Sequence, residues 1–207
     1  MGEINLWVIL FAAFIAAGSP GPATLAIAGT SMSSGRRAGL ALASGVTTGS
    51  FIWSIAAAFG LGAVMAANAW VFEVVRYVGA VYLLCLAVKS ARAAWAGAAL
   101  QAKPQPHTAP PRAYMHGLAL HLTNPKAVLF FGALYAIGIP AGTPASALVL
   151  VIAAVGAQSL LMFHAYALIF SSAPMAKTYA RAKRGFEAFF AVAFGAIAIK
   201  VLTTRVE

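Results

Sequence analysis

The sequence predicts an all-α integral membrane protein with six transmembrane helices, arranged as two inverted-topology repeats of three helices, with helices 1 and 4 broken. Three observations support this fold class. The chain of 207 residues is 62% hydrophobic and only 9% charged, whereas soluble domains are about half apolar and a quarter charged. Apolar stretches of about 18 or more residues recur along the chain, and each is long enough to cross a bilayer core. Prolines interrupt two of these stretches at corresponding places.

The hydrophobic runs place the spans and divide the chain into halves. The predicted spans cover residues 4–28, 39–65, 71–88, 115–139, 146–170 and 186–202. We expect the first to be a retained helix and not a signal peptide, because no basic residues precede it. Residues 1–95 form the first predicted repeat, 96–113 a linker rich in Ala, Gln and Pro, and 114–207 the second repeat. Since each half has an odd number of spans, the second half enters the membrane from the opposite face.

Basic residues predict the orientation of the chain in the membrane. Ten of the fourteen lie after spans one, three and five: Arg36, Arg37, Lys89, Arg92, Lys103, Arg112, Lys177, Arg181, Lys183 and Arg184. Because such loops stay in the cytoplasm, both termini are expected outside it. The net charge of +10 does not indicate nucleic acid, since the basic residues separate hydrophobic runs and do not alternate with aromatic residues on a polar face.

The interruption in the first span contains Pro20 and Pro22. Neither has a backbone N–H, and their rings press against the carbonyls of Ala16 and Gly18. In a membrane such a break is tolerated only where protein or a wet cavity receives the freed polar groups. The fourth span has its own break, where Asn124 can cap a new half-helix and Pro125 suits its first turn.

Paired breaks suggest a binding site. A broken helix presents partial negative charge at its unwound carbonyls and partial positive charge at the following amides. An amino acid zwitterion needs partners of both signs, so residues 18–22 and 124–126 are candidates for binding it. Two ordinary proline kinks with no ligand are the alternative, although breaks at corresponding positions of opposite halves favour a functional site.

Lys126 is too deep in its predicted span to reach the interface comfortably. It could hold a substrate carboxylate or exchange a proton. Alternatively, it binds the carbonyls freed by the first break as a structural contact, and the two roles are not exclusive.

Other polar residues are candidates for the pocket or for proton coupling. His121 lies about one turn before Pro125, and His164 lies in the fifth span beside Tyr166. A membrane histidine can carry a proton, although a lone one more often hydrogen-bonds a neighbouring helix. Thr47 and Thr48 supply polar groups in the second span. Glu73 and Glu187, near span ends, are expected at the interface.

Several chemistries have no motif in the sequence. A phosphate loop, a Gly-x-Ser-x-Gly elbow and a metal-ligand cluster are all missing. We therefore predict no catalytic residues, no metal and no cofactor, which leaves gradient-driven transport and not an enzyme.

Small residues four apart, such as Gly45 and Gly49, permit close helix contact and a possible homodimer.

Four motifs carry a family resemblance over nearly the whole chain. Ser19-Pro20-Gly21-Pro22, Gly79 to Leu84, Thr123 to Ala127 and Tyr166-Ala-Leu168 resemble the LysE/RhtB family of amino acid exporters. The resemblance implies a secondary transporter of the bacterial inner membrane that exports amino acids or small derivatives by proton antiport. The second span has no acidic residue where some members carry one, which favours a neutral substrate and leaves the proton carrier unassigned.

Two other functions stay open. One is a membrane scaffold or regulatory subunit without transport activity, which would have no use for a lysine deep in the membrane. The other is an inorganic or metal ion exporter of related architecture, which the shortage of carboxylates disfavours.

Overall fold

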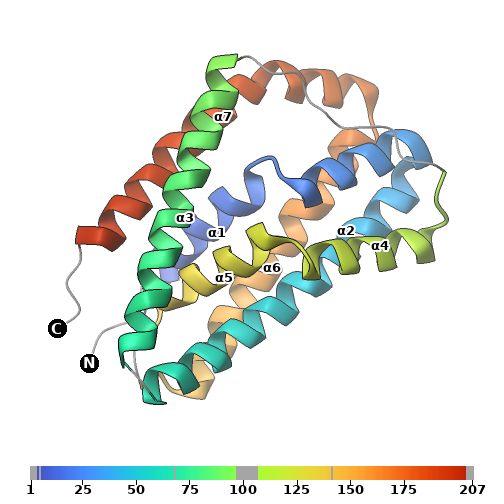
Figure 1. Cartoon of the computed structure of the whole chain (residues 1–207). Coiled ribbons are helices and arrows are strands. Elements are labelled where there is room, and N and C mark those ends of the chain that lie inside the picture. The colour runs from blue at the N-terminus through green and yellow to red at the C-terminus, as the bar shows by residue number, and fades with distance from the viewer. Residues whose placement is uncertain (1–3, 5, 68, 97–106, 141, 204–207) are drawn as a thin grey trace.

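The computed structural model describes residues 4, 6–67, 69–96, 107–140 and 142–203. These residues form seven α-helices (Figure 1): α1 Leu6–Gly18, α2 Pro22–Ala67, α3 Ala69–Ala96, α4 Pro110–Leu122, α5 Pro125–Gly138, α6 Ala145–Phe170 and α7 Ala173–Thr203. Four helical segments are long and apolar enough to cross a membrane: 22–60, 77–96, 145–170 and 173–203. The predicted all-helical membrane architecture is confirmed at this level.

Both predicted breaks are present. The first separates α1 from α2 at residues 19–21, and the second separates α4 from α5 at Thr123 and Asn124. The Asn124 side chain accepts a 3.0 Å hydrogen bond from the Lys126 amide, and Pro125 occupies the first turn of α5. Asn124 is therefore the helix cap that the sequence predicts.

The connection between the first and second predicted spans is narrower than the gap between residues 28 and 39 that the sequence predicts. Helical structure continues on both sides of Gly35, which alone leaves helical geometry, with φ 80° and ψ 178°. A positive φ is easily reached only by glycine, so one residue suffices to reverse the chain inside α2. Figure 1 shows the two arms of α2 folding back from this point.

The basic loop predicted at residues 177–184 is wrong, because these residues form the first turns of α7. Alanine, lysine and arginine are good helix formers, and neither glycine nor proline interrupts Met175 to Arg184. The third span is also longer than predicted, since α3 continues to Ala96. Of the predicted linker, residues 97–106 lie outside the described part of the chain.

The helices pack around a centre made by α1 and α5 (Figure 1). The most extensive contacts join α2 to α4 and to α6, and α3 to α7. Small residues permit the closest approach: Gly45 lies against the backbone of Tyr114, and Gly117 against that of Leu42. The glycine face of α2 is thus occupied by α4 of the same chain and provides no surface for a second copy.

Candidate functional site

The two breaks meet in the middle of the bundle. Pro20 and Pro22 have no N–H to bond the carbonyls of Ala16 and Gly18, four residues earlier. Each of these carbonyls has a partner from another helix. Lys126 Nζ donates to Ala16 O at 3.1 Å, and the Tyr166 hydroxyl donates to Gly18 O at 2.5 Å.

Lys126 makes three hydrogen bonds to the first break. Its ammonium group donates to Ala16 O, to Ser19 O at 3.0 Å, and to the Ser19 hydroxyl. An ammonium group has three donors, so all of them are used. The structural contact considered from the sequence is therefore present, and Lys126 lies against Gly21, where a Cβ would come within 3.2 Å of its side chain.

A cavity of about 50 Å³ adjoins these groups. Its lining joins α1, α2, α4, α5 and α6: Ala16, Ala17, Ser19, Gly21, Ala23, Thr24, Ser50, His121, Asn124, Lys126, Ala127, Phe130, Phe131, Ser159 and Phe163. Since one water needs about 10–15 Å³ on this kind of measure, the cavity has room for a few waters. It is too small for an amino acid while Lys126 stays where it is.

Most of the predicted binding residues lie at this cavity. Ser19, Gly21, Asn124 and Lys126 line it, together with His121. Pro20, Pro22 and Pro125 are outside the lining and shape the breaks. The Gly21 amide, which would bond Ala17 in a continuous helix, instead donates to Thr24 Oγ1 at 2.8 Å.

The other predicted polar residues lie elsewhere. Thr47 and Thr48 bond carbonyls of their own helix, at 2.9 and 3.0 Å. His164 bonds Leu160 O through Nδ1 at 2.8 Å and Ser44 Oγ through Nε2 at 3.0 Å. None of these three residues belongs to the cavity lining.

Tyr166 and Gly18 line a second, apolar cavity of about 510 Å³. This cavity lies between α1, α6 and α7, and most of its larger lining residues are aromatic, among them Phe14, Tyr179 and Phe190. The bond from Tyr166 to Gly18 therefore lies at the wall of this second cavity.

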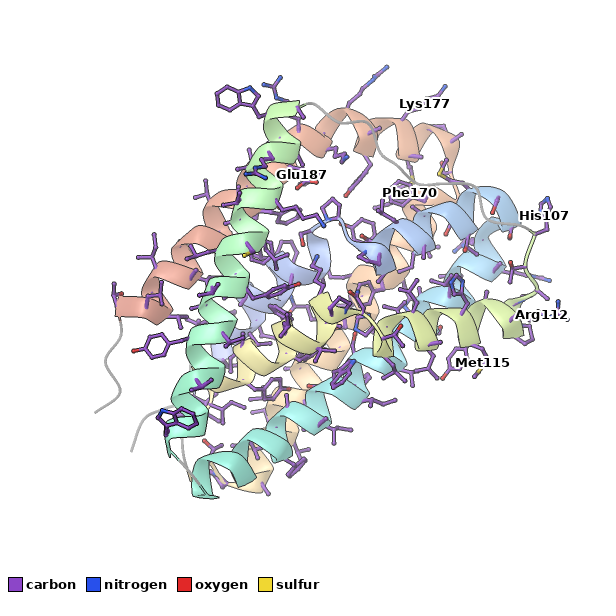
Figure 2. The ribbon with its side chains drawn as sticks, in the orientation of Figure 1. His107, Arg112, Met115, Phe170, Lys177 and Glu187 are labelled. Carbon is purple, nitrogen blue, oxygen red and sulfur yellow. The ribbon has the colours of Figure 1, made fainter. Side chains whose placement is uncertain are left out.

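Glu187 is buried within the protein and only 5% exposed; its expected depth at the membrane interface stays a prediction. It lies one turn before Phe190, which packs against Gly18 at the first break. Figure 2 labels Glu187 on the side of α7 that faces the bundle. It interacts electrostatically with Lys126, Tyr166 and Tyr179. The sequence signal that could have identified it is the buried stripe of α7, in which Glu187, Phe190, Phe194 and Ala198 recur at helical spacing.

Ser50 and Ser159 are further cavity residues that sequence reasoning did not select. Ser50 bonds His121 Nε2 at 3.1 Å. Their helices are rich in small and polar residues, so the sequence alone does not separate the hydroxyls at the cavity from those bonded within a helix.

Comparison with known proteins matches residues 14–205 to the family model of the LysE type translocator. The chain belongs to this family. It is 26% identical over 189 residues to the threonine efflux protein of Escherichia coli (strain K12), covering 90% of this chain and 92% of that protein. The threonine efflux protein of Salmonella typhi is 25% identical over 190 residues, with the same coverage.

A third relative is the leucine efflux protein of Enterobacter sp. (strain 638), which is 34% identical over 134 residues, 63% of this chain and 61% of that protein. No solved structure matches the chain. Family membership and the apolar helices together make this LysE type translocator a multi-pass membrane protein.

Proposed function

We propose that this protein exports amino acids, with neutral ones favoured, across the bacterial inner membrane in exchange for protons. The observation that carries the proposal is the hydrogen-bonding of Lys126 to the carbonyls freed at the first break. The Lys126 ammonium group lies where carbonyl oxygens could also accept hydrogen bonds from the α-ammonium group of an amino acid. The efflux proteins among its relatives support the substrate class.

Binding then works by exchange of partners. The substrate carboxylate draws the Lys126 ammonium away from Ala16 and Ser19, and the substrate ammonium takes the carbonyls that Lys126 leaves. The exchange keeps every buried charge paired, which a membrane interior requires. It also enlarges the cavity by the volume that the lysine side chain vacates.

The proposed membrane topology has six spans. The first consists of α1 with the first arm of α2, and the fourth of α4 with α5. The second arm of α2, α3, α6 and α7 provide the other four. Contacts between the spans proposed as counterparts support inverted repeats around a central site: the first span meets the fourth through α1 and α5, the second meets the fifth through α2 and α6, and the third meets the sixth through α3 and α7. The repeats comprise residues 1–95 and 114–207, joined by residues 96–113.

The alternatives receive less support. A scaffold has no need of a lysine bonded to broken-helix carbonyls. For a metal ion exporter, the described residues contain no group of three His, Cys, Asp or Glu that could hold an ion.

Flux in proteoliposomes tests the proposal. The purified full-length chain is reconstituted and assayed with a panel of amino acids, with and without an imposed pH gradient. We expect selective flux of one or a few neutral amino acids, accelerated by the gradient in the direction opposite to proton flow. No amino acid flux above that of protein-free vesicles would contradict amino acid transport, and flux indifferent to the gradient would contradict proton antiport.

A further inference from the structure

One ring nitrogen of His121, in the last turn of α4, has no partner among the residues that the structure describes. The residue is 5% exposed, and Nδ1 is buried with no hydrogen bond to any described residue. Leaving such an atom unsatisfied costs about 1–3 kcal/mol. A polar atom kept in this state at a cavity points to a ligand that satisfies it when bound.

The hydrogen bonds of Ser50 indicate which nitrogen carries the proton. The Ser50 hydroxyl donates its one hydrogen to Val46 O at 3.2 Å. With that hydrogen on Val46 O, the Ser50 oxygen accepts from His121 Nε2 at 3.1 Å, and we assign the ring hydrogen to Nε2 on this ground. In the neutral imidazole Nδ1 is consequently a bare lone pair.

The ring orientation directs Nδ1 away from α2. The Cδ2 and Nε2 edge of the ring lies against Gly49 and Ser50. Nδ1 is the ring atom opposite this edge, so it is directed away from Gly49 and Ser50. Phe131 and Phe163 pack edge-on to the ring, with centroids 6.5 and 5.9 Å away.

The charged neighbours of His121 are few. Lys126 on α5 lines the same cavity. On α2 the basic residues Arg36 and Arg37 are exposed at the Gly35 turn, far along the helix from Ser50. On α5 the Tyr135 hydroxyl bonds Ser54, and on α6 His164 has both nitrogens bonded. Lys89 on α3 and, to a smaller extent, Glu187 on α7 act electrostatically on Lys126.

We propose that Nδ1 of His121 binds the transported proton, in competition with the α-ammonium of the amino acid. This inference rests on the proposed function and assigns the atom that binds the proton exchanged for the amino acid. With substrate bound, the neutral ring accepts a hydrogen bond from the substrate ammonium at Nδ1. After release outside, a proton from that side binds Nδ1 and gives an imidazolium. This proton leaves to the cytoplasm before the next substrate binds, so one site alternates between the two cations.

Electrostatics enforces the alternation. An imidazolium beside the Lys126 ammonium repels a further cation, and its Nδ1 has become a donor that cannot accept from the substrate. Proton and substrate thus exclude each other without any gate dedicated to that purpose.

The test uses His121→Gln in the reconstituted full-length chain, with radiolabelled L-threonine and L-leucine as probes. The glutamine amide N–H can still reach Ser50, but the side chain does not titrate. His164→Gln is the matched control, because that histidine has both nitrogens bonded outside the cavity. His121→Asn is assayed in parallel, and thermal unfolding in detergent confirms which variants are folded.

Two readouts separate coupling from structure. For the wild type and His164→Gln we expect accumulation driven by the pH gradient. At pH values below the pKa of the imidazole, their apparent affinity for substrate should fall about tenfold for each unit by which the pH is lowered. The reason is that the fraction of protein with a neutral imidazole, the form that binds substrate, falls by that factor. For folded His121→Gln or His121→Asn we expect exchange of external for internal substrate at a reduced rate, because the hydrogen bond from the substrate ammonium to Nδ1 is lost, without gradient-driven accumulation and with pH-independent affinity.

Other results would overturn the inference. Gradient-driven accumulation by a folded His121 variant excludes this residue as the proton carrier, and so does a wild-type pH slope in that variant. If both folded variants lose substrate exchange as well as accumulation, His121 has a structural role instead. If the wild type exchanges no amino acid, the proposed function itself fails, which is a result distinct from a failure confined to the His121 variants.

Discussion

The Tyr166 hydroxyl on α6 donates a 2.5 Å hydrogen bond to the Gly18 carbonyl at the end of α1. Pro22 cannot bond this carbonyl, because it has no N–H. Lys126 serves the Ala16 carbonyl, which Pro20 leaves free, in the same way. Each proline of the first break therefore has its lost hydrogen bond replaced by a side chain from the second half of the chain.

Tyr166→Phe should destabilise the protein by about 1–3 kcal/mol, because it leaves the buried Gly18 carbonyl without its donor. Unfolding followed by circular dichroism in detergent measures the change. Tyr114→Phe is the control: it removes a bond to Thr48 Oγ1, but that hydroxyl still donates to Ser44 O. We expect the control to cost only about 0.5–1 kcal/mol, and equal losses in the two variants would contradict a special role for Tyr166.

Lys126→Met should reduce amino acid flux by about 100-fold or more, because a half-buried cation that we propose to pair with substrate is replaced by an apolar stem of similar length. Lys126→Arg should recover part of the flux, since it keeps the charge but not the compact ammonium geometry. Flux is measured in proteoliposomes, with Lys177→Met as the control, because Lys177 is exposed near the start of α7. Wild-type flux in Lys126→Met would remove this lysine from the mechanism.

The local geometry of both breaks could be predicted from the sequence. Proline identifies by itself which carbonyls lose their partner, four residues earlier, and Asn-Pro identifies the start of α5. Lys126 could be placed deep in the membrane by counting residues along its span. The rules for the prolines and the cap are local, and the structure agrees with them at Ala16, Gly18 and Asn124, whereas the depth of Lys126 in the membrane stays a prediction.

The neighbours contributed by other helices could not be predicted, because they depend on the rotation of each helix about its axis. Glu187 and Ser50 face the interior only through the way α7 and α2 pack. Thr47 and Ser50 lie within one turn of each other, yet only Ser50 reaches the cavity. The start of α7 was missed for another reason: basic residues were interpreted as a loop, although their helix propensity is high.

Gly45→Ala should destabilise the protein by roughly 1–3 kcal/mol, because a Cβ there would collide with the backbone carbonyl of Tyr114 on α4. Backbone cannot move aside as a flexible side chain can. Gly132→Ala, on α5, is the matched control, since its Cβ would meet nothing within 4 Å. There the substitution should be neutral or stabilise by about 0.4–1 kcal/mol. Thermal unfolding of the two variants in one detergent compares them, and a tolerated Gly45→Ala would contradict the close α2–α4 contact.

A double-mutant cycle tests the interaction between Lys126 and Glu187. Lys126 is half-buried and Glu187 is buried, and each single change, Lys126→Met or Glu187→Gln, removes one of these two opposite charges and leaves the other without it. The double variant buries neither charge, so we expect it to be more stable than the sum of the single effects predicts, by about 0.5–3 kcal/mol. Denaturant unfolding in detergent supplies the four free energies of unfolding. Additive effects would show that the two residues do not interact.

Cysteine labelling tests the orientation of the protein. The exposed Cys85 is first replaced by serine, which gives a background without native thiols. Figure 2 shows Lys177, His107 and Arg112 away from the beginning of α1 and the end of α7. Because basic segments stay in the cytoplasm, we expect Lys177→Cys to react with a membrane-impermeant maleimide only after the cells are permeabilised.

Ser146→Cys provides the opposite arm of this experiment. Ser146 is exposed at the start of α6, one membrane crossing from Lys177 and on the side proposed to carry both termini. It should therefore react in intact cells. Labelling of Lys177→Cys but not Ser146→Cys in intact cells would invert the proposed topology, and the direction of proton flow inferred for His121 would have to be inverted with it.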